Sequence, residues 1–226
     1  MKITFYGHSC ILIETCGKRI LFDPFISFNE KAKHIDLEKL NVDYILISHG
    51  HEDHVADAET LAKMHNAVIV SNFEIVSWYQ QKGIEKVWPM NHGGTKEFDF
   101  GSIKYVNAVH SSVLPDGTYG GNPGGFVLKN EEGCVYFAGD TALTMDMELL
   151  GRHMDLDLAI LPIGDNFTMG VGDAIICSDM INCNKVMGVH FDTFPPIVID
   201  HNQAVEEFKA AEKELILLEI GENIEL

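Results

Sequence analysis

The chain is poor in basic residues and has no long apolar run. Its 226 residues include 16 Lys and Arg against 34 Asp and Glu, which gives a formal net charge of −18. This charge repels phosphodiester backbones and anionic membranes, so we expect neither nucleic-acid nor membrane partners. No stretch approaches membrane-spanning length. Residues 1–6 alternate like a strand and lack the apolar block of a signal peptide, which favours a cytoplasmic protein.

Cysteine pairs and arginines are also scarce. The cysteines are odd in number and form no Cys-x-x-Cys motif: Cys10, Cys16, Cys134, Cys177 and Cys183. This pattern predicts a reducing compartment, without a disulfide framework or a thiolate zinc site. The two arginines, Arg19 and Arg152, adjoin none of the motifs described below. A firmly bound phosphate usually contacts an arginine fork, so a phosphorylated substrate is disfavoured.

Apolar patterns predict one α/β domain over residues 1–226. Strands are expected at 2–6, 10–14, 19–22, 43–47, 67–70, 103–109, 125–129, 134–138, 156–161, 185–189 and 215–218. Helices are expected at 55–66, 73–82, 173–181 and 202–213. Early hairpins followed by strand–helix alternation favour two sheets packed face to face and covered by helices.

The most informative segment follows the apolar run 44–48. It reads His49, Gly50, His51, Glu52, Asp53 and His54. Crowded histidines repel one another when protonated, and carboxylates leave water at a cost unless a positive charge, such as a divalent metal, compensates them. Alternate side chains of an extended segment share a side, so His49 and His51 can reach one ion. A following helical turn would direct Asp53 and His54 toward a second ion.

Two coordination spheres need further ligands, and three candidates follow predicted strands. His110 follows 103–109, His190 follows 185–189, and Asp140 comes shortly after 134–138. A site at a sheet edge is assembled from such strand ends. A single histidine at a strand end is more often structural, but the shared context with the 49–54 motif favours a metal site.

The order of these motifs resembles the metallo-β-lactamase fold superfamily. It comprises His49-x-His51-x-Asp53-His54, a lone histidine, Gly-Asp-Thr at 139–141 and a late histidine. Segments 7–10, 22–24, 164–170 and 190–195 are similar to a largely uncharacterised branch of metal-dependent hydrolases, akin to the ascorbate-6-phosphate lactonases. The resemblance covers essentially the whole chain. It implies a four-layer αβ/βα sandwich, with two mixed sheets flanked by helices and a dinuclear metal site at one edge.

The resemblance also implies roles for individual residues. The first metal would be held by three histidines: His49, His51 and His110. The second would be held by Asp53, His54 and His190, and Asp140 would bridge the two. Asp23 matches an early aspartate that supports the metal loop from outside the ligand set. His8 lies in the opening motif, where a pocket residue and a buried structural histidine are both open interpretations.

The expected activity is hydrolysis of a small molecule at an ester, lactone, amide or phosphoester bond. Two divalent ions roughly 3.5–4 Å apart can share a hydroxide and polarise the substrate. We expect zinc first, with manganese, iron or nickel as alternatives, because the same ligands accept all four. Asp53 and Asp140 are the candidate catalytic carboxylates. Phe167, Met169 and Phe194 are expected as apolar walls of the pocket or as packing residues.

Other functions stay open. Iron-dependent redox chemistry occurs on the same fold, although its di-iron branch typically has glutamate where this chain has His51. The acidic charge disfavours a nuclease, and a non-catalytic metal module would leave open coordination positions unexplained. A lipid or nucleotide phosphodiesterase is a variant within hydrolysis. The sequence does not determine the substrate, the metal or the oligomeric state, a homo-oligomer included.

Overall fold

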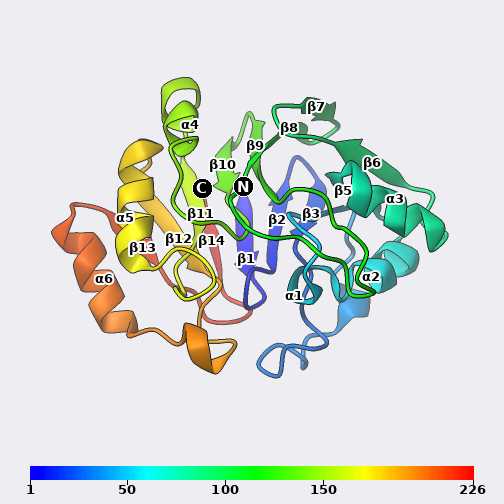
Figure 1. Ribbon diagram of the computed structural model, residues 1–226, viewed down its shortest axis with the longest axis horizontal. Coiled ribbons are helices and arrows are strands. Elements are labelled where there is room, and N and C mark those ends of the chain that lie inside the picture. Colours follow the sequence, from blue (N-terminus) through cyan, green and yellow to red (C-terminus); the bar gives the residue numbers. More distant parts are fainter.

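The computed structural model describes residues 1–226 as two sheets of seven strands each, packed together with helices on their outer faces (Figure 1). The first sheet has the spatial order β14 (Asn223–Glu225), β1 (Lys2–Phe5), β2 (Ile11–Thr15), β3 (Lys18–Phe22), β4 (Tyr44–Leu46), β5 (Val68–Asn72) and β6 (Val87–Met90). The second has the order β13 (Glu214–Ile216), β12 (Lys185–Val189), β11 (Leu158–Pro162), β10 (Gly133–Phe137), β9 (Gly124–Asn130), β8 (Gly101–Asn107) and β7 (Thr95–Phe98). Parallel and antiparallel pairs occur in both, which confirms the predicted sandwich of mixed sheets.

Helices cover each sheet on the side away from the other sheet (Figure 1). The first sheet carries α1 (Glu52–Val55), α2 (Ala58–His65) and α3 (Phe73–Gln81), and the second carries α4 (Met147–His153), α5 (Val171–Met180) and α6 (His201–Ala210). Short 3₁₀ turns occupy Leu37–Lys39 and Pro195–Ile197. None of the helices combines the length and apolarity that crossing a bilayer requires.

The strand pattern explains why three apolar cores form. Successive side chains of a strand point to opposite faces, so a strand that is apolar throughout supplies two cores at once. In β2, Ile11 and Ile13 enter the core between the sheets, and Leu12 packs under the helices of the first sheet. In β11, Ile160 enters the same central core and Leu161 packs under the helices of the second sheet. Both sheets are therefore covered on two faces.

The predicted helix at 55–66 is wrong in detail, because two helices replace it. The chain forms α1, turns at residues 56–57, and then forms α2. Asp57 in this turn is buried, and its Oδ2 accepts hydrogen bonds from the backbone N–H groups of Ile26 at 2.6 Å and Ser27 at 2.9 Å. The backbone N–H of Asp57 in turn donates to the carbonyl oxygen of Pro24. These tertiary contacts accompany the interruption and join it to the loop after β3.

Four elements were absent from the sequence prediction: β6, β7, α4 and β14. Three of them, β6, β7 and β14, are edge strands; β6 contains Pro89, and β7 contains Lys96 and Glu97. Proline and charge are tolerated at sheet edges, where one side of the strand faces solvent. The weak apolar signal of these strands reflects their position in the sheets.

The strand directions bring many loop segments to one edge of the sandwich. β1, β3 and β4 run in the same direction in the first sheet, as do β8, β10, β11 and β12 in the second. Hydrogen bonds join the carboxyl ends of these two sets of strands. The N–H of His190 donates to the carbonyl of His8 at 2.8 Å. The carbonyl of Ser48 accepts from the N–H of Gly124 and from the hydroxyl of Tyr105, each at 3.1 Å. The segments after these strands therefore meet across the two sheets.

Candidate metal centre

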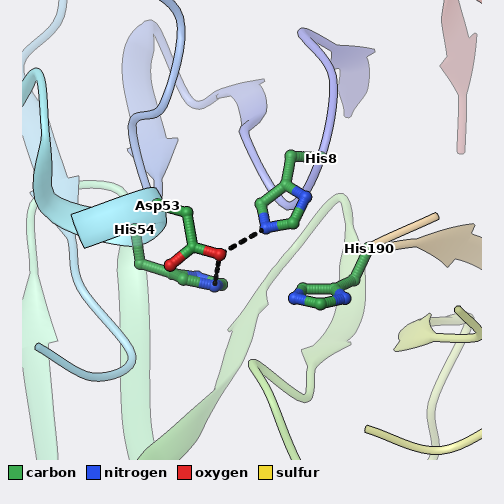
Figure 2. A group of neighbouring side chains, drawn as sticks. All are labelled: His8, Asp53, His54 and His190. Atoms are coloured by element: carbon green, nitrogen blue, oxygen red, sulfur yellow. Dashed lines mark hydrogen bonds and ion pairs between the residues drawn. The ribbon is translucent and has the colours of Figure 1, made fainter. Parts of the chain in front are cut away.

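The structure brings all seven predicted ligand residues to this shared edge. They lie after β4, on α1 and after β8, β10 and β12: His49, His51, Asp53, His54, His110, Asp140 and His190. Three groups of side chains have ligand atoms within 4.8 Å of one another; one, of Asp23, His49 and His54, overlaps the other two, which contain six of the seven predicted ligands. Of these two, one contains His49, His51 and His110, and the other contains Asp53, His54 and His190 together with His8 (Figure 2).

Glu52 is the acidic residue of the 49–54 motif that joins neither group. Its side chain is exposed and lines a separate cavity of about 360 Å³, together with Phe28 and Trp78. Adjacent residues of a helix point in different directions, so Glu52 faces away while Asp53 and His54 of the same helix face the centre. Glu52 is therefore outside the ligand groups, in agreement with its absence from the predicted ligands.

A single oxygen of Asp140 lies between the two groups. Asp140 Oδ2 is 3.0 Å from His190 Nε2 and 3.4 Å from His54 Nε2 on one side. On the other side it is 3.6 Å from His110 Nε2 and 3.9 Å from His49 Nε2. The carboxylate is almost completely buried. One acceptor thus faces imidazoles of both groups.

Asp23 and Ser48 determine which ring nitrogens point inward. Asp23 is fully buried and has a backbone φ of 42°. Its Oδ1 accepts from the N–H of Ser48 at 2.7 Å, and its Oδ2 accepts from the Ser48 hydroxyl at 2.6 Å and from His54 Nδ1 at 2.8 Å. Because the Ser48 hydroxyl donates to Asp23, it accepts from His49 Nδ1 at 2.9 Å. Both histidines then direct Nε2 toward the centre.

His51 is oriented in a comparable way from the opposite side. Its Nε2 lies 3.2 Å from the hydroxyl of Ser111, and its Nδ1 lies 2.9 Å from His49 Nε2. When Nε2 donates to Ser111, the lone pair of Nδ1 points at the same place as that of His49. Two neutral nitrogen ligands therefore converge, as the alternation of residues 49 and 51 predicts.

Buried atoms without hydrogen-bond partners test whether a cation fits here. Four side-chain atoms of this kind occur in the structure: Ser9 Oγ, His54 Nε2, Asp140 Oδ1 and His190 Nδ1. Leaving a buried polar atom unsatisfied costs roughly 1–3 kcal/mol. Three of the four atoms belong to the candidate ligand residues, so the unmet bonding capacity is concentrated at the centre. The nitrogen and oxygen donors present are those that borderline divalent ions accept.

The charges of the centre depend on its histidines. Burial lowers the pKa of three histidines, which are therefore held neutral: His49, His51 and His110. Burial also disfavours a charge on His54, but the carboxylates of Asp140 and Asp23 outweigh it and raise the pKa of His54 well above 6.5. Conversely, burial would raise the pKa of Asp140, but His54 holds it well below its ordinary value. A positive charge thus compensates the carboxylates, and a divalent cation would take over that role.

His8 belongs to the second group, which the sequence left undecided. It is buried, and its Nε2 lies 3.1 Å from Asp53 Oδ2 (Figure 2). Its Nδ1 lies 3.0 Å from Thr193 Oγ1. Burial lowers the pKa of His8 to about 4, so the ring is neutral at neutral pH. Its ring centroid is 4.2 Å from that of His190. The only sequence signal was its place in the opening motif, and nothing local indicated Thr193 or Ser48.

The predicted pocket walls divide into two kinds. Met169 is fully buried in the core beneath the helices of the second sheet, so it is a packing residue. Phe167 and Phe194 are 54% and 36% exposed, and the ring centroid of Phe194 is 5.5 Å from that of His8. Neither arginine is near the centre: Arg19 bonds Glu14 and the carbonyl of Leu40, and Arg152 bonds Glu148.

Known proteins are similar to this chain in fold and in sequence. Residues 2–190 match the "Beta-lactamase superfamily domain" family. A "UPF0173 metal-dependent hydrolase" from Flavobacterium johnsoniae is 60% identical over 226 residues, which covers all of both chains. Igni18, "a novel metallo hydrolase" from Ignicoccus hospitalis, is 31% identical with a TM-score of 0.90, covering 100% of this chain and 97% of that one.

A more distant likeness concerns the fold alone. The "metallo-beta-lactamase fold protein YhfI" from Bacillus subtilis is 15% identical, with a TM-score of 0.77 over 100% of this chain and 99% of that one. It supports the predicted architecture independently of close sequence identity. With the match over residues 2–190 and the full-length identity to a curated relative, the chain belongs to the UPF0173 metal-dependent hydrolase family of the β-lactamase superfamily.

Proposed function

We propose that this protein is a dinuclear hydrolase that cleaves an ester, lactone, amide or phosphoester bond of a small molecule. The observation that carries the proposal is the position of Asp140 Oδ2, which faces imidazoles of both ligand groups at 3.0–3.9 Å. A shared carboxylate between two sets of donors suits two neighbouring cations better than one.

The ligand assignment follows the two groups. One ion would be held by His49, His51 and His110, the other by Asp53, His54 and His190, with Asp140 common to both. Imidazole and carboxylate donors suit zinc, with manganese, iron and nickel as alternatives. Neutral imidazoles also leave the charge of the metal largely uncancelled, which preserves its Lewis acidity. Bound there, two divalent ions would supply Lewis acidity and a water of lowered pKa.

The two carboxylates have different surroundings and therefore different roles. The side chain of Asp53 is 27% exposed, whereas that of Asp140 is 3% exposed. Because Asp53 reaches solvent, it can steer the attacking water and pass a proton to the leaving group. Asp140 is enclosed by four imidazoles and serves to hold the two ligand groups at a fixed separation.

The surroundings of the centre favour a carbonyl substrate over a phosphoester. Phe167 and Phe194 present apolar surface on the segments that follow β11 and β12. Both arginines of the chain are engaged elsewhere, so no guanidinium is available as a phosphate fork. An uncharged ester, lactone or amide is the substrate class that this surface fits best.

Metal analysis and a substrate panel test the proposal together. The protein would be purified without added metal, its metals quantified by elemental mass spectrometry, and its activity assayed on lactones, aryl esters, amides and phosphodiesters. We expect about two equivalents of zinc or manganese and turnover of a carbonyl substrate that the Asp140→Asn variant loses. Predominant iron with no hydrolysis would favour the redox alternative, and no metal after reconstitution would contradict the proposal.

A further inference from the structure

His8 differs from the other imidazoles of the second group in how its nitrogens are used. Both of its ring nitrogens have partners: Nε2 lies 3.1 Å from Asp53 Oδ2 (Figure 2), and Nδ1 lies 3.0 Å from Thr193 Oγ1. His54 and His190, by contrast, each leave one buried ring nitrogen without a partner. His8 therefore has no unused ring nitrogen to offer a cation, while its two neighbours each have one.

The partners of His8 also determine where its hydrogen lies. An ionised carboxylate only accepts, so His8 Nε2 must carry the hydrogen and donate it to Asp53. In a neutral ring Nδ1 then accepts, and the hydroxyl of Thr193 is the donor. The resulting chain of hydrogen bonds runs from Thr193 in the loop after β12, through His8 in the loop after β1, to Asp53 on α1.

The ring of His8 is held firmly in this orientation. The residue has a backbone φ of 56°, and its carbonyl oxygen accepts from the N–H of His190 at 2.8 Å. The rings of Phe25 and Phe194 contact it edge-on, with centroid distances of 5.6 and 5.5 Å. With only 1% of the residue exposed, the ring cannot turn toward solvent and its donor stays directed at Asp53.

We propose that His8 is a positioning residue: it orients the carboxylate of Asp53 toward the second metal by donating a hydrogen bond from Nε2, and it does not bind the metal itself. The hydroxyl of Thr193 selects the ring form that makes this donation. The inference rests on the proposed dinuclear site and adds a function for two residues outside its ligand set. Hydrogen bonds of this kind to a ligand typically contribute 10–100-fold to metal affinity.

Three variants separate positioning from metal binding. His8→Leu removes the donor, His8→Gln keeps an N–H donor on a side chain of similar reach, and Thr193→Val removes only the hydroxyl. Zinc would be titrated into metal-free protein against a chromophoric chelator, which reports the affinity of each equivalent. We expect His8→Leu to weaken one of the two equivalents, the one held by Asp53, His54 and His190, by about 10–100-fold and to leave the other unchanged. Thr193→Val should give a smaller loss, and His8→Gln should stay close to the wild type.

A matched control tests whether the loss of any histidine has the same effect. His65 on α2 is half-buried, lies 2.9 Å from the carbonyl of Leu37 and belongs to none of the ligand groups, so His65→Leu should bind both equivalents as the wild type does. Thermal unfolding of each metal-free variant checks its folding. If His8→Leu does not fold, His8→Gln and Thr193→Val still decide the question.

Two results would overturn the inference. In the first, both equivalents bind unchanged when the donor or the Thr193 hydroxyl is removed. In the second, His8→Gln loses as much affinity as His8→Leu, which would mean that the imidazole itself is a ligand. Wild-type protein that binds fewer than two equivalents would instead contradict the proposed dinuclear function, so the two failures are distinguishable.

Discussion

At the scale of single residues, the centre depends on side chains that would not touch a metal. Asp23 uses both carboxylate oxygens to hold Ser48 and His54, and Ser48 passes this orientation on to His49. One buried carboxylate thereby sets the hydrogen positions of two imidazoles that belong to different ligand groups. Hydrogen bonds of this kind, made to a ligand by residues outside the ligand set, favour the imidazole tautomer that can bind a cation.

Ser48→Ala should weaken metal binding selectively. The hydroxyl that accepts from His49 Nδ1 is lost, whereas His54 keeps its own bond to Asp23. We expect the metal bound by His49 to be weakened by about 10-fold or more, with the other affected less, in a zinc titration against a chelator. Ser77→Ala on α3, where the hydroxyl bonds the carbonyl of Phe73, is the control. Equal loss at both sites would contradict this role of Ser48.

The burial of His8 predicts a pH dependence of the metal-free protein. Its folded pKa of about 4 lies below the unfolded value of 6.5, because burial disfavours the charged ring. The stability from the neutral ring is therefore present above pH 6.5 and is lost as the pH falls through 4. The free energy of unfolding should fall by about 3 kcal/mol more between pH 7 and pH 4 in the wild type than in His8→Gln. Urea unfolding at each pH measures this free energy for both proteins. If it falls equally with pH in the wild type and in His8→Gln, the prediction is wrong.

At the scale of elements, the centre is built where segments after strands approach one another closely. The segment after β11 passes the segment after β12 at Gly164, where a Cβ atom would lie 2.0 Å from the carbonyl oxygen of His190. No side chain fits such a gap, so glycine is required for close approach and not for an unusual φ angle. The position of His190 thus depends on a residue of the neighbouring strand connection.

Gly164→Ala should displace the backbone of His190. We expect a loss of about 1–3 kcal/mol in the free energy of unfolding, together with weaker binding of the second metal equivalent. Gly172→Ala is the matched control, because Gly172 lies in α5 and a Cβ atom added there would meet no other atom within 4 Å. This control should gain up to about 1 kcal/mol from helix propensity. Denaturant unfolding and the zinc titration compare Gly164→Ala with Gly172→Ala. Equal stability and equal zinc affinity of the two variants would exclude the steric explanation.

At the scale of the whole molecule, the two halves of the sandwich contribute different parts of the centre. The first sheet and α1 supply His49, His51, Asp53 and His54, and the second sheet supplies His110, Asp140 and His190. A cation bound to both sets would link the two sheets. Because the unfolded chain has no such arrangement, the free energy of metal binding adds to the stability of the folded state.

Removal of metal should therefore lower the melting temperature. A site saturated at 1,000 times its dissociation constant contributes about 4 kcal/mol, which for a chain of this size corresponds to a shift on the order of 10 °C. Calorimetry of chelator-treated and zinc-reconstituted protein measures the difference. The Asp140→Asn variant should show a much smaller rise on addition of zinc. An unchanged melting temperature in the wild type would argue against a metal that joins the sheets.

Much of the architecture and of the ligand constellation could be predicted from the sequence. Strands buried on both faces leave continuous apolar runs, and the 49–54 motif places several ligand types in one turn, so both signals are local. The edge strands β6 and β7 and the division of the predicted helix at Asp57 could not be predicted in this way. Their patterns depend on which side of a sheet faces solvent and on contacts with residues 26 and 27.

The sequence by itself thus determined the family, the sandwich and the residue types gathered for metal chemistry. Only the tertiary structure decided how those residues are oriented: that Glu52 faces away, that Ser48 links Asp23 to His49, and that Thr193 lies against His8 across 185 positions of the chain. The physical reason is that ligand types and apolar periodicity can be recognised within short segments of the sequence. The hydrogen positions and free lone pairs of a buried imidazole depend on partners that folding alone brings together.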